Sequence, residues 1–219
     1  MKILCISDQI DPQVYSPQIK ERFSDVDLIL SAGDLPLNYL DFIISTLNKP
    51  LFFVFGNHHT NDLKFFKNIW NYPLIEEEER HSFYCGAIHM GSKVRTEGNF
   101  ILAGLGGCMW YNNGINQFTD FQMFIEAVKL IPKLLWNRVF HGRYLDVLLT
   151  HAPPLGIHDK KDRCHSGFKT YLWFMKTFKP KFLVHGHVHL YDLCDERSTK
   201  WESTVVINAY SHYILEFGS

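Results

Sequence analysis

Short, unbroken apolar runs recur along the chain, and each ends at a glycine or at a cluster of polar residues. The most complete run is Leu51–Phe55, which Pro50 and Gly56 bound. An apolar run of this length, without alternating polar positions, is typical of a strand that is buried on both faces. Runs of the same kind predict buried strands over four further ranges, Lys2–Ser7, Asp27–Ala32, Leu145–Thr150 and Lys181–Val184.

Segments with helical spacing separate the first of these runs. Three helices are predicted, over Ser16–Phe23, Leu37–Leu47 and Asp62–Trp70. The longest helical stretch is Thr119–Phe140, and Pro132 should kink or split it because proline removes a helical hydrogen bond. Strand and helix alternate over the first fifty residues, which is typical of βαβ units.

Shorter strands are predicted in the rest of the chain. Glu76–Arg80 is expected to be an acidic turn, and Ser82–Cys108 alternates short strands with glycine turns, ending in Phe100–Leu105. The tail alternates like antiparallel strands over Leu190–Cys194, Ser203–Ala209 and Tyr213–Phe217. No repeat, low-complexity tract or obvious linker interrupts the pattern, so a single domain over residues 1–219 is expected.

Composition narrows the class of protein. With 46% apolar and 21% charged residues, the chain can form a substantial core. The formal net charge of −1 argues against a broad surface for nucleic acid or anionic membrane. Five cysteines, an odd number without CxxC spacing, indicate reduced thiols, and no apolar run approaches the roughly 20 residues of a membrane span. A cytoplasmic protein without a transmembrane segment is therefore expected.

Ligand-type side chains follow the ends of five predicted strands: Asp8, Asp34, Asn57-His58, His151 and His187-Val188-His189. In open α/β sheets, ligands bind at the carboxyl ends of the strands, so these side chains are expected to meet. Mixed oxygen and nitrogen donors suit Mn²⁺, Fe, Zn²⁺ or Co²⁺. The set is large enough for two ions that share a carboxylate, and two ions roughly 3.5–4 Å apart can clamp a phosphoryl group.

The order and spacing of these blocks resemble the calcineurin-like metallophosphoesterase family, over most of the chain from Asp8 to His189. Three further stretches are particularly similar to bacterial members without assigned substrates: Thr150–Pro154, His185–His189, and Tyr111-Asn112 with Asn116-Gln117. The resemblance implies an α/β fold, a four-layer sandwich of two mixed β-sheets that pack face to face and are flanked by helices. The metal centre would lie at one edge of that sandwich.

The resemblance also implies a role for each block. The metal ligands would form a bridge and two terminal sets: Asp34 as the bridge, Asp8 and His189 on the first ion, and Asn57, His151 and His187 on the second. A metal-bridging hydroxide would attack phosphorus in line, without a phosphoenzyme. His58 would contact the phosphate and protonate the leaving oxygen, a step worth typically about 10²–10⁴-fold.

One position departs from the pattern of the family. The first block usually reads Asp-x-His, and here Ile10 stands where the histidine would be. Isoleucine cannot bind a metal, so the first site should be weaker, differently filled or completed by another group. Asp11 and His165 are the candidates for a substitute ligand, because Asp11 is adjacent and His165 belongs to a ligand-rich loop after His151.

Two stretches allow more than one interpretation. Tyr111 and Asn112 would line a substrate pocket or form the polar tip of a hairpin, and the pocket is slightly favoured. Leu134–Tyr144 mixes aromatic and basic residues, which suits a lipid-contacting helix. A core helix with an arginine-bearing edge is the favoured interpretation of that stretch.

The function expected from these observations is metal-dependent hydrolysis of a phosphodiester or phosphomonoester on a small molecule. The near-neutral charge counts against a nuclease. The alternative from another class is a non-catalytic binding module with a degenerate first metal site, because one retromer subunit resembles this family and serves as a scaffold. A hydrolase that uses a single ion is a third possibility. Oligomeric state and substrate do not follow from the sequence.

Overall fold

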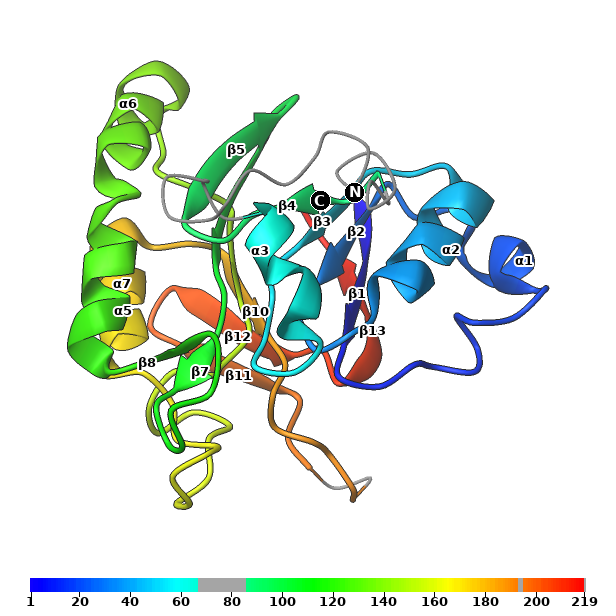
Figure 1. The fold of residues 1–219 in the computed structure, drawn as a ribbon. Coiled ribbons are helices and arrows are strands. Elements are labelled where there is room, and N and C mark those ends of the chain that lie inside the picture. The colour runs from blue at the N-terminus through cyan, green and yellow to red at the C-terminus, as the bar shows by residue number, and fades with distance from the viewer. Residues whose placement is uncertain (67–85, 193–194, 219) are drawn as a thin grey trace.

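The structure is a computed structural model, and it describes residues 1–66, 86–192 and 195–218 (Figure 1). Its first sheet has five strands in the order β13-β1-β2-β3-β4. The four strands β1 to β4 run parallel, and β13 pairs with β1 in antiparallel fashion. The bounds are Lys2–Ser7 for β1, Leu28–Ser31 for β2, Leu51–Phe53 for β3, Ile88–His89 for β4 and Ser211–Glu216 for β13.

The second sheet has six strands in the order β11-β12-β10-β9-β6-β5. Its four inner strands are parallel, and both edge strands are antiparallel to their neighbours. The bounds are Lys93–Glu97 for β5, Phe100–Leu105 for β6, Val147–Thr150 for β9, Phe182–His185 for β10, Ser198–Trp201 for β11 and Thr204–Asn208 for β12. A small parallel pair, β7 (Cys108–Met109) and β8 (Gln117–Phe118), lies beside it.

Three clusters of buried side chains define the layers. The central cluster joins inward-facing residues of both sheets, among them Cys5, Leu30, Leu149 and Val184, so the sheets pack face to face. A second cluster packs α1 (Ile19–Phe23) and α2 (Leu37–Leu47) on the outside of the first sheet. A third packs α5 (Asp120–Val128), α6 (Ile131–His141) and α7 (Lys169–Phe178) on the second sheet. The predicted four-layer sandwich of mixed sheets and outer helices is confirmed.

The predicted elements agree with the structure in the first half of the chain. The strand ranges match β1, β2 and β3 within a few residues, and α2 has the predicted bounds. After the short 3₁₀ turn Thr60–Asp62, helix α3 covers Leu63–Phe66. The rest of the helix predicted to Trp70, the acidic turn Glu76–Arg80 and the start of Ser82–Cys108 lie outside the described residues.

Proline splits the long helical stretch as predicted. Helix α5 ends at Val128 and α6 begins at Ile131, with Pro132 in the first turn of α6. Proline is tolerated there because the first N–H groups of a helix have no partner within it.

Two predictions for the second half are wrong. Leu190–Asp192 forms no strand, and the remainder of Leu190–Cys194 is outside the described residues. The tail is not simply antiparallel either, because β12 pairs with β10 in parallel and is antiparallel only to β11. Helix α7 and strand β11 lie outside the predicted set. The signal for α7 was present, since its buried residues recur at helical spacing: Tyr171, Phe174, Met175 and Phe178.

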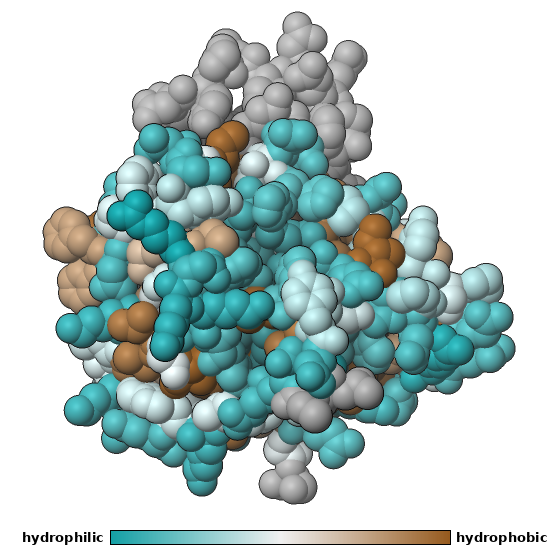
Figure 2. All heavy atoms as spheres, turned by 90° about the horizontal axis from the view of Figure 1, so that it is seen from below, coloured by the Kyte–Doolittle hydropathy of each residue, from teal (hydrophilic) through white to brown (hydrophobic). Residues whose placement is uncertain are grey.

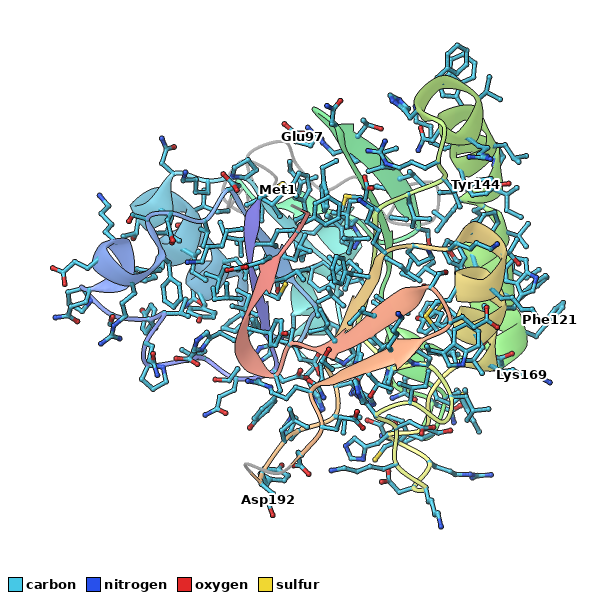
Figure 3. The ribbon with its side chains drawn as sticks, turned by 180° about the vertical axis from the view of Figure 1, so that it is seen from behind. Met1, Glu97, Phe121, Tyr144, Lys169 and Asp192 are labelled. Atoms are coloured by element: carbon cyan, nitrogen blue, oxygen red, sulfur yellow. The ribbon has the colours of Figure 1, made fainter. Side chains whose placement is uncertain are left out.

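The favoured interpretation of Leu134–Tyr144 as a core helix is also wrong for most of its surface. Only Leu134 and Asn137 of α6 are buried. An apolar face points to solvent instead, with exposed fractions of 51% at Leu135, 55% at Trp136, 77% at Val139 and 61% at Phe140. Figure 3 shows this helix layer at the outer side of the molecule, with Phe121 pointing away from it. Among the described residues, no helix is both long and apolar enough to cross a membrane.

Candidate metal centre

Three of the predicted ligands sit in an unusual backbone conformation directly after their strands. Asp8 follows β1, Asp34 follows β2 and His187 follows β10, with φ angles of 63°, 56° and 67°. Left-handed backbone at a residue other than glycine costs about 1–3 kcal/mol and persists only where surrounding contacts hold it. Here the amide of His187 donates to Asp8 Oδ2 at 2.9 Å. Such strain is typical of functional sites, and it turns all three side chains toward the same edge.

Glycines let the strand ends approach one another closely. A Cβ added at Gly56 would lie 2.5 Å from His151 Cε1, and one added at Gly186 would collide with the Ser7 side chain. Because these two glycines have no Cβ, they leave room for the side chains that meet at the carboxyl ends of the strands. That edge lies on the face seen in Figure 2, which is mostly hydrophilic.

Four predicted ligands converge around His151. Its Nε2 lies 3.1 Å from His187 Nδ1, 3.2 Å from Asn57 Oδ1 and 3.3 Å from Asp34 Oδ2. With metal–ligand bonds of about 2.0–2.2 Å, neighbouring ligand atoms of one ion are about 2.8–3.6 Å apart. The set therefore fits the second ion, and its carboxylate and two imidazoles are buried.

Backbone carbonyls fix which ring nitrogens face the centre. His151 Nδ1 donates to the carbonyl of Ala32 at 2.8 Å, and His187 Nε2 donates to that of Cys164 at 2.5 Å. A carbonyl can only accept, so the opposite nitrogens, His151 Nε2 and His187 Nδ1, face each other across the centre. A divalent ion, or a proton on His151 when no ion is bound, supplies the positive charge that these nitrogens and the Asp34 carboxylate share. Such outer hydrogen bonds orient metal-binding histidines in general.

The titration of the two imidazoles agrees with that arrangement. Burial by itself lowers the pKa of His151, but the charge of Asp34 and its hydrogen bond, with the charge of Asp8, raise it to about 9. Burial and the neighbouring His151 lower the pKa of His187 to about 3. Burial would raise the pKa of Asp34, but the charge and hydrogen bond of His151, together with the hydrogen bond from the His58 amide, outweigh burial and lower the pKa. Without an ion, one proton on His151 therefore balances the carboxylates.

The first site is more open than the second. Asp8 Oδ1 lies 3.9 Å from His189 Nε2, and the His189 side chain is 40% exposed. The other oxygen of Asp8 accepts hydrogen bonds from the Ser7 hydroxyl and from the amide of His187. Burial raises the pKa of the Asp8 carboxyl. Ile10 is 44% exposed, and it supplies no ligand to the centre.

The structure separates the two candidates for a substitute ligand. The Asp11 carboxylate is buried and occupied, since it accepts from Ser211 Oγ at 2.5 Å, His212 Nδ1 at 2.5 Å and the amide of Gln13 at 2.7 Å. His165 instead lines the cavity of the site, with its ring 5.2 Å from the ring of His187. Of the two candidates, His165 is therefore the one that lies at the cavity, and its Nδ1 is hydrogen-bonded to Asp162 Oδ1 at 2.8 Å.

The ligands open into a cavity of about 230 Å³, lined by Asp8, Asp34, Asn57, His58, His59, Tyr111, Cys164, His165, His187 and His189. His58 is exposed at this cavity, and its amide donates to Asp34 Oδ1 at 2.8 Å. Tyr111 faces the cavity as well, where its hydroxyl accepts from Asn57 Nδ2 at 3.4 Å. Asn112 serves the hairpin instead, because its Oδ1 accepts from Gln117 Nε2 at 2.7 Å.

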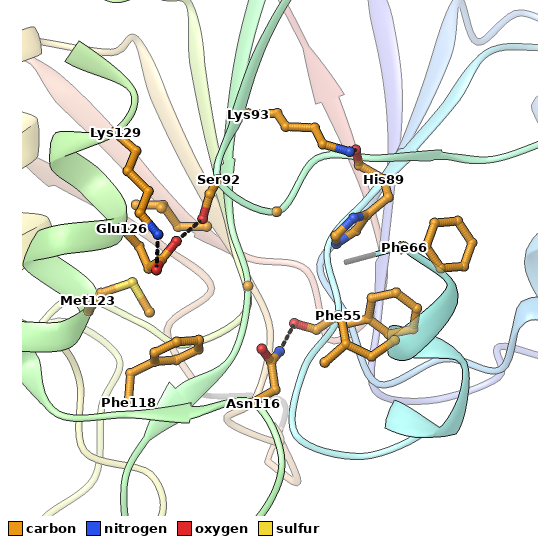
Figure 4. A pocket seen from close by; sticks show the side chains of 14 residues that line it. Phe55, Phe66, His89, Ser92, Lys93, Asn116, Phe118, Met123, Glu126 and Lys129 are labelled. Carbon is orange, nitrogen blue, oxygen red and sulfur yellow. Dashed lines mark hydrogen bonds and ion pairs between the residues drawn. The ribbon is translucent and has the colours of Figure 1, made fainter. Parts of the chain in front are cut away.

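Two residues at the site, Cys164 and Asn116, have roles that the sequence analysis did not predict. Cys164 lines the cavity, and its position beside His165 in a ligand-rich loop was the available signal. Asn116 holds the strand end that carries Asn57, since its Nδ2 donates to the carbonyls of Phe55 and Gly56 at 3.0 and 2.8 Å. Figure 4 shows Asn116 and Phe55 in a second, larger cavity of about 540 Å³ behind this peptide.

Comparison with known proteins agrees with the fold. The family model described as calcineurin-like phosphoesterase matches residues 1–191. The chain belongs to that family. Members of the calcineurin-like phosphoesterase family typically bind divalent metals, which suits the donors found here. A search of curated proteins by sequence gave no match.

A structure search found solved structures that are similar to this calcineurin-like phosphoesterase at low sequence identity. The protein TT1561 of Thermus thermophilus is 11% identical with a TM-score of 0.59, over 96% of this chain and 89% of that one. A metallophosphoesterase from Sphaerobacter thermophilus is 14% identical with a TM-score of 0.42, over 99% and 84%. A Vps29 mutant from Entamoeba histolytica is 13% identical with a TM-score of 0.43, over 99% and 86%. At 11% identity, the likeness to TT1561 concerns the fold alone.

Proposed function

We propose that this chain hydrolyses a phosphodiester or phosphomonoester of a small molecule, by direct attack of water and without a phosphoenzyme. The observation that carries the proposal is the convergence of Asp34, Asn57, His151 and His187, with the two ring nitrogens that face each other free to bind an ion. Divalent ions held there would lower the pKa of a bound water and polarise the phosphoryl oxygens.

The ligands divide into a closed site and an open one. Asp34, Asn57, His151 and His187 would hold the ion of the second site, and Asp8 and His189 would hold that of the first, with Asp34 proposed as a ligand shared by both. Two ions are proposed, of Mn, Fe, Zn or Co, because the donors are mixed oxygen and nitrogen atoms. The first site is the weaker of the two, since Ile10 removes an imidazole from it.

His58 is the proposed proton donor. It is exposed at the cavity mouth, one residue after Asn57, and its amide is anchored to Asp34. A phosphate bound against the ligands would lie within reach of its ring, which can protonate the leaving oxygen. A cavity of about 230 Å³ suits a small substrate better than a polymer.

Hydrolysis of chromogenic phosphomonoesters and phosphodiesters tests the proposal. The chain is freed of metal with a chelator and assayed after addition of Mn²⁺, Co²⁺ or Zn²⁺. We expect metal-dependent turnover that falls about 10²–10⁴-fold in His58→Ala and is abolished in His151→Ala. His141→Ala is the matched control, because His141 is exposed at the end of α6 and should leave the rate unchanged.

A binding module with a degenerate first site is the second candidate, favoured by Ile10 alone. It predicts the same weak background rate for the native chain, His58→Ala and His151→Ala with every metal tested. A single ion per chain with full turnover would favour a one-metal hydrolase instead. Elemental analysis beside the assay separates these outcomes.

A further inference from the structure

A second group of metal-type ligands lies on the loop after β9, outside the ligand blocks described above. Asp162, Cys164 and His165 bring a carboxylate, a thiol and an imidazole together. Asp162 Oδ1 lies 2.8 Å from Cys164 Sγ and 2.8 Å from His165 Nδ1, and the sulfur lies 3.2 Å from the same nitrogen. Three different donor atoms thus meet within the spacing that ligands of one ion require.

The loop is fastened to the central site. Cys164 and His165 both line its cavity, and the carbonyl of Cys164 accepts the hydrogen bond from His187 Nε2. The base of the loop is closed by the amide of Gly167, which donates to Asp159 Oδ2 at 3.1 Å. Asp162 lies toward solvent, with its side chain 50% exposed. An ion can therefore reach the group from outside while two of its ligands stay at the cavity.

The donor types distinguish this group from the central one. The central ligands are carboxylate, amide and imidazole, which also suit Mn²⁺, whereas a thiolate selects softer ions such as Zn²⁺. Three protein ligands leave one position of a tetrahedral ion open, as in catalytic zinc sites. Cys164 and His165 direct that position to the cavity, where a phosphate oxygen or water can occupy it.

We propose that Asp162, Cys164 and His165 form a separate, thiolate-containing cation site that takes Zn²⁺ or a similar thiophilic ion. Binding breaks the S–H bond of Cys164 and forms the S–Zn bond, and the proton passes to solvent. A cation bound on this loop would lie at the same cavity as the first metal site. In that first site, Ile10 stands where the family usually has a histidine ligand. The proposal stands whether or not the chain is a hydrolase.

Cobalt substitution tests this site by spectroscopy. A Co²⁺–thiolate bond gives a charge-transfer band in the near ultraviolet, and carboxylate, amide and imidazole ligands do not. We expect that band in the native chain at saturating Co²⁺ and its loss in Cys164→Ser. His165→Gln should weaken Zn²⁺ binding at the site at least about tenfold, since even outer partners of a metal are worth about 10–100-fold. His141→Gln is the matched control and should bind normally.

Two further measurements test whether the thiolate site is separate from the central ligands and whether Zn²⁺ binds Cys164. Asp34→Asn removes a central ligand and should leave the near-ultraviolet band in place, which separates this site from the proposed catalytic centre. In the native chain, Zn²⁺ should slow alkylation of Cys164, measured by mass spectrometry at that residue. Three results would each overturn the proposal: no band in the native chain, an unchanged band in Cys164→Ser, or an alkylation rate of Cys164 that is the same with and without Zn²⁺. Asp162, Cys164 and His165 would then form only a hydrogen-bonded turn.

Discussion

Replacing Gly56 by alanine should damage the metal centre more than the fold. The added Cβ would collide with Asp34 Oδ1 and would lie 2.5 Å from His151 Cε1, where ordinary contact begins at 3.4 Å. The His151 ring would have to move by about 0.9 Å, the difference between 3.4 and 2.5 Å, and the Asp34 carboxylate by more. Overpacking of this kind costs about 1–3 kcal/mol of stability. A misplacement of about 1 Å can cost 10²-fold in rate.

The assay compares metal affinity with stability in the same variant. Calorimetric titration of metal-free Gly56→Ala should show at least about tenfold weaker binding of Mn²⁺ or Zn²⁺ at the central site, because both Asp34 and His151 bind there. Urea unfolding should show a loss of about 1–3 kcal/mol. Gly98→Ala is the control: its φ is +55° and no atom lies within 4 Å of the new Cβ, so it strains the backbone without touching a ligand. Native affinity in Gly56→Ala would refute the reasoning.

Three further outcomes are expected. Because the pKa of His151 is raised to about 9, binding of one ion at pH 6 should release about one proton from that ring. Affinity should then rise about tenfold per pH unit toward pH 9, which titration in buffers of different ionisation enthalpy measures. Asn116→Gly should cost about 1–3 kcal/mol in urea unfolding, since it removes the side-chain donor to the carbonyl of Gly56 and leaves that of Phe55 with the amide of Gly107 alone. Burial and neighbouring His158 lower the pKa of His185 to about 3, so below pH 6.5 the unfolded chain binds a proton that the native chain does not. Stability should therefore fall by up to about 1.4 kcal/mol per pH unit between pH 6.5 and 3, and His185→Gln should lose that part of the dependence.

The ends of the buried strands could be predicted because a buried strand appears in the sequence as a continuous apolar run. An apolar run such as Leu51–Phe55 marks a strand that other layers cover, and the residues after it must emerge at one edge of the sheet. Parallel strands of one sheet share that edge, so Asp34 and Asn57, which follow β2 and β3, could be expected to meet before any coordinates were known. The prediction needed no knowledge of strand order. That His151, which follows β9 of the other sheet, joins them depends on how the two sheets pack, which only the family resemblance implied.

The parts that failed depend on contacts between distant segments. Asp11 is held by Ser211 and His212 of β13, some two hundred positions away, and nothing near Asp11 in the sequence signals that pairing. The exposure of Trp136 and Phe140 likewise depends on which stripe of α6 meets the second sheet. The left-handed backbone of Asp8 is likewise held by distant residues, since its amide donates to the carbonyl of Gly33 at 3.1 Å and its Oδ2 accepts from the amide of His187 at 2.9 Å.

The two halves of the centre differ in how firmly the fold holds them, and the departure at Ile10 lies in the looser half. His151 and His187 are buried, and each has its outer nitrogen tied to a carbonyl. His189 is partly exposed, and its Nδ1 bonds only to the side-chain hydroxyl of Tyr191, at 2.9 Å. A preorganised set binds an ion without the entropy cost of ordering its ligands, so the second site should fill first. If two ions bind as proposed, isoleucine in place of histidine at position 10 would weaken binding at the first site, and it would leave the buried set of ligands intact.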